Sequence, residues 1–259
     1  MAAVTFMSDF GEEDHYVAAV KAGILSANPA QSIIDISHNI RRHDIGHAAY
    51  IIKQLYASFP PETVHLIAVD PVQRGFDSLV AVKLNDHFFV SHDSGIFSLI
   101  DKQRPSQAVK LEQGASTFPA RDFLANAATR LANGHSLEEL GTPIAELQTR
   151  VDRQLKATKR EIVGQVIHVD HYGNLVTNIN KTDFDTIANL LGGNPSYRIR
   201  FLRERFEQFH KKFNDVESGD CFVLFNAYGF LEIGINKGRA CELLGLRMET
   251  PVLIEFNPN

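Results

Sequence analysis

The first 130 residues alternate short apolar runs with segments of helical spacing, and this alternation restricts the possible folds more than any other feature. Apolar runs lie at residues 4–8, 32–37 and 64–70, and residues 15–25 and 44–55 between them repeat apolar side chains at helical intervals. Strands that alternate with helices are typical of a sheet covered by helices. The pattern therefore predicts an α/β domain with a mostly parallel sheet and helices on both faces.

The rest of this region fits the same domain. Residues 79–84 and 87–90 have strand character, and Asn85-Asp86 between them is typical of a hairpin turn. Residues 122–132 have helical spacing and stop at Asn133-Gly134, a common end for a helix. We expect the α/β domain to span residues 1–150.

The character of the chain changes near residue 150. Residues 151–161 are polar and charged, which is typical of a linker. Beyond them apolar segments of strand length dominate: residues 162–169, 175–179, 197–201, 221–225, 230–235 and 251–256. We predict that residues 162–259 form a smaller all-β domain, a barrel or a sandwich.

Composition excludes several classes of function. The chain has 259 residues, 44% of them hydrophobic and 22% charged, which is ordinary for a globular protein. The net charge of −5 and the absence of a dense basic block argue against a nucleic-acid partner. No apolar run approaches membrane-spanning length and no leader pattern precedes the first strand, so we expect no membrane partner and a cytoplasmic location. The two cysteines suggest neither a disulfide framework nor a zinc site.

Aspartates stand at the ends of three predicted strands of the first domain: Asp9, Asp70 and Asp93. Any one of them could simply cap a helix or turn the chain. Ligands of α/β sheets, however, bind beyond the carboxyl ends of the strands, where these three side chains would meet. Together they favour a binding site, to which Asp14 in the first turn could also contribute.

Residues 168–178 form the densest polar cluster of the second domain. A hairpin on Tyr172-Gly173-Asn174 would explain the glycine and the asparagine but not Asp170, and residues 226–229 have the same ambiguity between turn and binding loop. The 11 histidines include no His-x-x-x-His or His-x-His pair beside a carboxylate on one element. We therefore expect no metal site.

Taken together, these segments resemble the SAM hydrolase family, the SAM hydroxide adenosyltransferases, which share their fold with the fluorinases and chlorinases. The resemblance covers essentially the whole chain, and the order and spacing of its motifs are specific. The motifs are Ser8-Asp9-Phe10-Gly11 with Asp14, Asp35-Ile36-Ser37-His38, Val69-Asp70-Pro71, His92-Asp93-Ser94-Gly95, Thr117-Phe118 with Arg121-Asp122, Asp170-His171-Tyr172-Gly173-Asn174, Asn226-Ala227-Tyr228-Gly229 with residues 230–233, and Leu243-Leu244-Gly245-Leu246.

The resemblance implies a homotrimer that binds SAM between the first domain of one subunit and the second domain of its neighbour, with SAM as substrate and no cofactor. Asp9 would hold the ribose diol and Asp14 would contact the methionine end. Asp170 would pair with the methionine ammonium, and Asn174 would hydrogen-bond to adenine. The remaining expected contacts are Phe10, Thr117, Phe118, Ala120, Tyr172 and Tyr228.

In the resembled family an Asp, an Arg and a His position the attacking water. The aspartate corresponds to Asp70. Asp77 stands at the arginine's place, with Arg74 displaced to three residues before it, and Pro119 stands at the histidine's place. The expected catalytic residues are therefore Asp70 and Arg74, with His43 or His92 as possible substitutes for the histidine.

Four functions remain open at this point. The first is hydrolysis of SAM to adenosine and L-methionine by attack of water or hydroxide at C5′. The second is binding of SAM or another adenosyl compound without turnover, because two residues of the triad are missing from their places. The third is attack by a different nucleophile, such as a halide. A metal-dependent hydrolase built on the strand-end aspartates is the weakest of the four.

Overall fold

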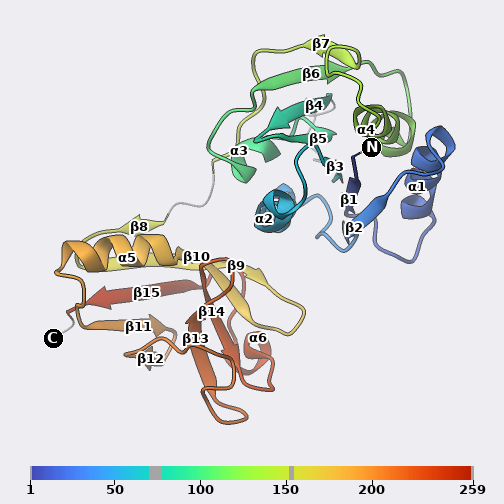
Figure 1. Cartoon of the computed structure of the whole chain (residues 1–259). Coiled ribbons are helices and arrows are strands. Elements are labelled where there is room, and N and C mark those ends of the chain that lie inside the picture. The colour runs from blue at the N-terminus through green and yellow to red at the C-terminus, as the bar shows by residue number, and fades with distance from the viewer. Residues whose placement is uncertain (1, 70–77, 152–154, 258–259) are drawn as a thin grey trace. The chain divides into compact units, whose positions relative to one another are not determined.

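The computed structural model describes residues 2–69, 78–151 and 155–257. The chain divides into two compact units, residues 1–152 and residues 153–259, which we call domain 1 and domain 2 (Figure 1). Asp70, Arg74 and Asp77 lie outside the described residues, and so does part of the predicted linker.

Domain 1 is an α/β domain, as predicted. Its seven strands are ordered β2-β1-β3-β5-β4-β6-β7. The strands are β1 (Val4–Ser8), β2 (Ile33–Ser37), β3 (Val64–Ala68), β4 (Leu79–Leu84), β5 (His87–His92), β6 (Gln107–Leu111) and β7 (Gly141–Pro143). Strands β2, β1, β3 and β5 pair in parallel, and β5, β4, β6 and β7 pair antiparallel. The sheet is thus mixed. Its parallel half includes β1, which ends at the turn with Asp9.

Helices cover both faces of this sheet (Figure 1). They are α1 (Tyr16–Ala27), α2 (Ile45–Leu55), α3 (Ile96–Ile100) and α4 (Ala125–Ala132), with a 3-10 turn η1 (Tyr56–Ser58) and a π-helical turn η2 (Ala120–Leu124). Side chains alternate between the two faces: on β1, Phe6 packs in the core beneath α1 and α4, and Met7 packs in the core beneath α2 and α3. This alternation is the period-2 pattern of a strand buried on both sides.

Local sequence signals account for the ends of several elements. The Asp44 carboxylate accepts a hydrogen bond from the backbone N–H of His47, so it caps the N-terminus of α2. The predicted hairpin is confirmed, because β4 and β5 pair around Asn85 and Asp86. These two residues have φ of 48° and 61°, as a type I′ turn requires.

Domain 2 is built on an antiparallel sheet that curves into a nearly closed barrel (Figure 1). Its strand order is β12-β11-β15-β9-β10-β14-β13, with β8 paired to β9. The strands are β8 (Lys156–Ala157), β9 (Glu161–Val169), β10 (Leu175–Asn180), β11 (Tyr197–Phe201), β12 (Glu204–Phe206), β13 (Cys221–Phe225), β14 (Phe230–Ile235) and β15 (Pro251–Phe256). The six predicted strand segments each form a strand.

Four elements of domain 2 lie outside the six predicted strand segments. Strand β8 lies within the predicted linker 151–161, strand β12 pairs with β11, and a short helix α6 (Ala240–Leu243) follows β14. The helix α5 (Lys181–Leu190) is capped by the Asn180 side chain, which accepts from the N–H of Asp183. An otherwise all-β domain therefore carries one helix of ten residues.

Candidate functional site

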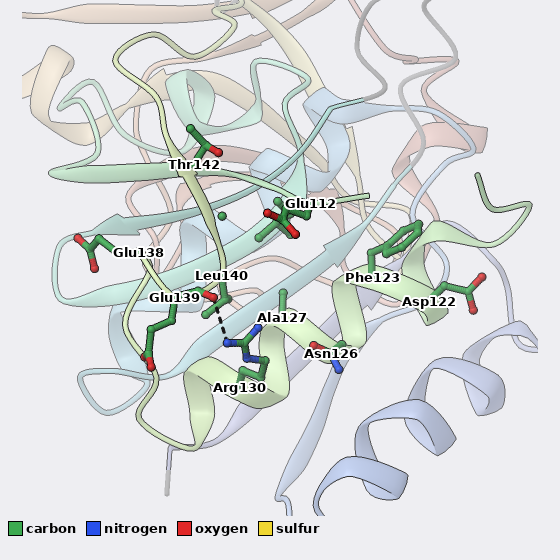
Figure 2. A pocket seen from close by; sticks show the side chains of 12 residues that line it. Glu112, Asp122, Phe123, Asn126, Ala127, Arg130, Glu138, Glu139, Leu140 and Thr142 are labelled. Carbon is green, nitrogen blue, oxygen red and sulfur yellow. Dashed lines mark hydrogen bonds between the residues drawn. The ribbon is translucent and has the colours of Figure 1, made fainter. Parts of the chain in front are cut away.

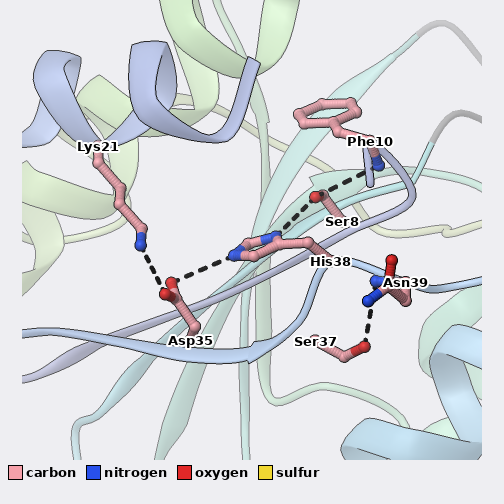
Figure 3. A network of polar contacts seen from close by, with 7 residues as sticks. All are labelled: Ser8, Phe10, Lys21, Asp35, Ser37, His38 and Asn39. Carbon is pink, nitrogen blue, oxygen red and sulfur yellow. Dashed lines mark hydrogen bonds and ion pairs between the residues drawn. The ribbon is translucent and has the colours of Figure 1, made fainter. Parts of the chain in front are cut away.

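The turn after β1, residues 8–14, is held by a chain of polar contacts that runs from the buried Ser8 and His38 to Asp35 and Lys21 near the surface, and that we call the Ser8 network (Figure 3). Ser8 Oγ lies 2.7 Å from His38 Nδ1, and His38 Nε2 lies 3.2 Å from Asp35 Oδ1. Lys21 Nζ reaches the other oxygen of Asp35 at 2.5 Å. Burial opposes ionisation of Asp35, but hydrogen bonds from Lys21 and His38 outweigh it and lower the pKa of this carboxyl.

The network contains a serine, a histidine and an aspartate in the order of a nucleophilic triad, but its burial excludes that role. Ser8 is 0% exposed and His38 is 4% exposed, so no substrate atom can reach the hydroxyl. The acceptor-only Asp35 favours a proton on His38 Nε2, which leaves Nδ1 to accept from the Ser8 hydroxyl. The backbone N–H groups of Phe10 and Gly11 then donate to Ser8 Oγ and to the His38 carbonyl, at 3.5 and 2.8 Å. The network thus fixes the turn that carries Asp9.

Asp9 is held in place on the same turn. Its Oδ2 accepts from the backbone N–H of His43 at 2.8 Å, and its side chain is 6% exposed. His43 Nδ1 lies 4.0 Å from the same oxygen, and the His43 ring is half exposed. The backbone of His43 has a φ of 62°, a left-handed conformation that costs a non-glycine residue about 1–2 kcal/mol. This strained residue, a sequence-predicted candidate, is therefore a neighbour of Asp9.

Three aromatic rings lie beside this turn. Phe10, Tyr16 and Phe118 contact one another, with ring centroids 5.4–5.9 Å apart. Phe10 and Phe118 are half-buried and Tyr16 is 41% exposed, so the cluster has an apolar face near the surface. The structure therefore brings together two predicted ligand contacts, Phe10 and Phe118, that are 108 positions apart in the sequence (118 minus 10).

The segment before α4 also orders its predicted contacts locally. The Ser116 hydroxyl accepts from the N–H of Phe118 at 2.8 Å and contacts the Asp122 carboxylate at 2.6 Å. Thr117 between them is exposed, whereas Ala120 in the π-helical turn η2 is 5% exposed. Thr117 and Phe118 thus lie on one short, hydrogen-bonded segment.

Asp93, the other strand-end aspartate that the structure describes, differs from Asp9. Asp93 is 8% exposed, and its Oδ1 accepts from the N–H of Gln148 at 2.9 Å. Burial raises the pKa of Asp93 despite this hydrogen bond. Asp93 thus anchors the segment near residue 148, which is the structural role that its sequence position allowed. Asp14, by contrast, is exposed on the turn.

In domain 2 the turn between β9 and β10, residues 170–174, is organised by Asp170. Its Oδ1 accepts from the backbone N–H of Asn174 at 2.8 Å, and its Oδ2 accepts from the Asn174 side-chain nitrogen at 3.3 Å. Gly173 has a φ of 85°, and a Cβ there would lie 2.9 Å from the Cβ of Arg239. The turn therefore requires a glycine and sits tightly against the segment before α6.

A buried carboxylate, Glu232 on β14, connects this turn with the next one. Its Oε1 accepts from Asn174 Nδ2 and its Oε2 from Asn226 Nδ2, both at 3.1 Å. Glu232 is 6% exposed, and burial raises its pKa, with the charge of Asp170 acting in the same direction. We call Asp170, Asn174, Asn226 and Glu232 the amide cluster.

Two exposed tyrosines stand on the turns that the amide cluster joins. Tyr172 is 75% exposed and Tyr228 is 58% exposed. The Asn226 side-chain oxygen accepts from the N–H of Tyr228 at 3.0 Å, so this second turn is ordered from within. Both predicted contacts are available to a ligand on the surface of domain 2.

Sequence reasoning did not single out Glu232 as a site residue. The available signal was a carboxylate in the middle of the otherwise apolar strand at residues 230–235. Sequence reasoning also missed the Ser8 network. Its hydrogen bond joins residues 8 and 38, which only the tertiary structure brings together.

A cavity lies elsewhere in domain 1 (Figure 2). It has a volume of about 360 Å³ and is lined by residues of α4 and of the segments around β6 and β7, among them Glu112, Asn126 and Arg130. Arg130 donates to the Glu139 carbonyl at 3.0 Å. None of the predicted ligand contacts lines it.

Among the residues that the structure describes, no group of three or more His, Cys, Asp or Glu side chains is placed to hold a metal ion. Within those same ranges, no helix combines the length and the apolar character needed to cross a membrane.

The fold defines a two-domain protein with an α/β unit followed by a β-barrel unit. The Ser8 network lies in the first unit and the amide cluster in the second. The SAM hydroxide adenosyltransferase N-terminal domain matches residues 4–141, and the corresponding C-terminal domain matches residues 164–253. The chain therefore belongs to the SAM hydroxide adenosyltransferase family.

Several named relatives and a solved structure are similar to this chain. The chain is 30% identical to proteins named (R)-S-adenosyl-L-methionine hydrolase from Methanocaldococcus jannaschii, with 94% of this chain and 92% of the relative covered, and from Thermus thermophilus, with 97% and 99% covered. It is 27% identical to a fluorinase of Nocardia brasiliensis over 71% of this chain and 73% of that protein. An uncharacterised conserved protein from Thermotoga maritima has a similar structure, with a TM-score of 0.86, 29% identity, and 97% and 99% of the two chains covered.

Proposed function

We propose that this protein hydrolyses S-adenosyl-L-methionine to adenosine and L-methionine, by attack of water or hydroxide on C5′ of the ribose. Nearly full-length relatives named (R)-S-adenosyl-L-methionine hydrolase support the reaction. The observation that carries the proposal is the amide cluster of domain 2, where Asp170 and Asn174 are locked together at the positions proposed for the ammonium and the adenine.

In domain 1, Asp9 is proposed to bind the ribose diol. A carboxylate accepts from both hydroxyls of a diol, and this one is already oriented by the His43 N–H. Orientation before binding lowers the entropy cost of fixing the substrate. Asp14, exposed at the end of the same turn, is proposed to meet the methionine end, and Thr117 and Ala120 to line the adenosyl pocket.

In domain 2, Asp170 is proposed to pair with the methionine ammonium and Asn174 to hydrogen-bond to adenine. Tyr172 and Tyr228 are proposed to pack against the ligand, because aromatic rings on exposed turns offer apolar faces at little entropy cost. In the resembled family the two half-sites meet between subunits, so we also propose a homotrimer. A cytoplasmic location stays a prediction.

The chemistry requires alignment and a dry surface rather than charge on the sulfonium. The positive charge on sulfur disappears as methionine leaves as a neutral thioether, so a group that strongly stabilised this charge would oppose the reaction. Alignment of the nucleophile with C5′ and exclusion of bulk water favour it. The contact between Phe10 and Phe118 beside Asp9 supports such an apolar wall.

Asp70 and Arg74 are proposed to orient the nucleophile, because Asp77 and Pro119 stand where the family has its arginine and its histidine. His43 is the better proposed substitute for the histidine, since its ring nitrogen lies 4.0 Å from the Asp9 carboxylate. Pro119 can neither donate nor accept a proton at its side chain.

The test is to incubate the purified protein with SAM in H₂¹⁸O and to separate the products by chromatography and mass spectrometry. Adenosine carrying ¹⁸O at the 5′-hydroxyl is expected, and Asp70→Asn should abolish it. Asp185→Asn, a change of an exposed carboxylate on α5, serves as the matched control and should retain full activity.

Other outcomes contradict the proposal in distinct ways. SAM binding by calorimetry without any product would mean a binding protein that has lost turnover. A halogenated 5′-deoxyadenosine formed in chloride buffer would mean a different nucleophile. Loss of activity with a chelator, restored by a divalent metal, would mean a metal-dependent hydrolase. Neither binding nor product would remove the SAM assignment altogether.

A further inference from the structure

Glu232 is an unusual residue for its position. Strand β14 lies between β10 and β13, and from Leu231 to Ile235 every residue of it is buried. A buried carboxylate is unfavourable by several kcal/mol unless it is paired or well hydrogen-bonded. In the described part of the chain no Lys, Arg or His forms an ion pair with Glu232, and its two oxygens instead accept from the amides of Asn174 and Asn226.

These contacts decide which way the Asn174 amide faces. The Asn174 side-chain nitrogen carries two hydrogens, and its two neighbours are Asp170 Oδ2 at 3.3 Å and Glu232 Oε1 at 3.1 Å. Carboxylates accept but do not donate, so an inverted amide would place its oxygen against two negative charges. Asp170 is four residues away on the same turn, whereas Glu232 comes from a different strand and adds a constraint that the turn alone lacks.

The fixed amide leaves one side-chain group for a ligand, the amide oxygen Oδ1 of Asn174. Within the ranges that the structure describes, this oxygen accepts no hydrogen bond, and the residue is half-buried rather than covered. A Cβ at position 234 would lie 2.6 Å from it and would also meet the Phe222 ring, so the glycine keeps a side chain from covering this oxygen. The amide cluster therefore presents an acceptor, not a donor, at this point.

We propose that Glu232 is a positioning residue that holds the Asn174 oxygen toward the ligand and thereby makes the site selective for a purine with a 6-amino group. The inference rests on the proposed function, in which Asn174 meets the base. An adenine amino group donates to this oxygen. The 6-oxo group of hypoxanthine or guanine presents a second acceptor there and is rejected, because two facing acceptors leave both unpaired.

The test compares nucleosides by calorimetry on the full chain, with adenosine and inosine as probes. The wild-type protein should bind adenosine roughly 10- to 100-fold more tightly than inosine, the ratio expected for one lost hydrogen bond with an unpaired acceptor. In Glu232→Gln the new amide can donate to the Asn174 oxygen and permit the inverted orientation. The adenosine-to-inosine ratio should then fall to within about threefold of unity.

The ratio separates positioning from a structural effect, because general loosening of domain 2 weakens both nucleosides alike. Glu207→Gln, a change of a carboxylate that is 74% exposed in the same domain, is the matched control and should keep the wild-type ratio. An unchanged ratio in folded Glu232→Gln overturns the proposal.

A second measurement needs no variant and keeps the proposal falsifiable if Glu232→Gln does not fold. The wild-type protein should also discriminate against N6,N6-dimethyladenosine, which lacks the donor hydrogens. Equal binding of adenosine, inosine and the dimethyl compound overturns the positioning role while leaving SAM binding intact. Failure of the wild type to bind SAM and all three nucleosides overturns the proposed function and this inference with it.

Discussion

A buried histidine in domain 1 makes the stability of this protein depend on pH. His65 on β3 is 0% exposed and lies between two polar partners: Thr5 Oγ1 is 2.8 Å from its Nδ1, and His87 Nδ1 is 3.2 Å from its Nε2. Its ring also packs against Phe89 at 4.8 Å. Burial, followed by repulsion from His87, lowers the pKa of His65 to about 3.

The sign and size of the effect follow from this pKa. The unfolded chain protonates His65 near pH 6.5 and the folded chain near pH 3, so between these values the unfolded state binds more protons. The stabilisation is complete above pH 6.5 and is lost as the pH falls. From pH 7.5 to pH 5 the loss is about 2 kcal/mol, obtained from 1.36 kcal/mol multiplied by about 1.5 pH units. Burial also lowers the pKa of His87, which adds to the loss.

The perturbation is His65→Gln, which keeps a hydrogen-bonding side chain but does not titrate in this range. Urea unfolding of the wild type and the variant at pH 7.5 and pH 5 gives a difference of differences in which most other titrating groups cancel. The variant will be less stable at pH 7.5, but it should lose about 2 kcal/mol less on acidification. Proton NMR of the ring gives an independent readout, with no titration of His65 above pH 4.

Two results would refute this reasoning. One is a His65 resonance that titrates near pH 6.5, which would mean that the ring is solvated. The other is an equal loss of stability in both proteins, which would assign the acid sensitivity to other groups.

Three further changes test the site and its scaffold. Gly173→Ala should destabilise domain 2 by about 2 kcal/mol or more, because φ is 85° and the new Cβ meets Arg239; Gly192→Ala, at a φ of 99° with nothing within 4 Å, should lose only about 1 kcal/mol in the same thermal unfolding assay. Asp44→Ala removes the cap of α2 and should lower the free energy of unfolding by about 1 kcal/mol, whereas an unchanged value would show that the cap is replaced. Asp9→Asn should weaken SAM binding about 10- to 100-fold by calorimetry if the carboxylate grips the ribose, and an unchanged affinity would remove that role.

Much of the fold was predictable because its signals are local. A strand or a helix is specified by the spacing of apolar residues along a few turns of chain, and the Asn85-Asp86 hairpin by residues that tolerate a positive φ. Helix α5 was overlooked, although its buried Ile187 and Ala188 with half-buried Phe184 follow helical spacing, because its many polar residues are typical of a loop. The antiparallel half of the sheet follows from strand pairing, which residue spacing does not specify.

The candidate site also has a part that was predictable from the sequence and a part that was not. The sequence by itself determined which residue types stand at the strand ends and turns, including Asp9, Asp170 and Asn174, and the resemblance supplied their proposed roles. Only the tertiary structure decided that Ser8 and His38 form a buried hydrogen-bonded pair, and that Glu232 accepts from the amide of Asn174, 58 residues away. Hydrogen bonds between distant segments depend on how the strands pair. The sequence around one partner does not indicate which residue the other partner is.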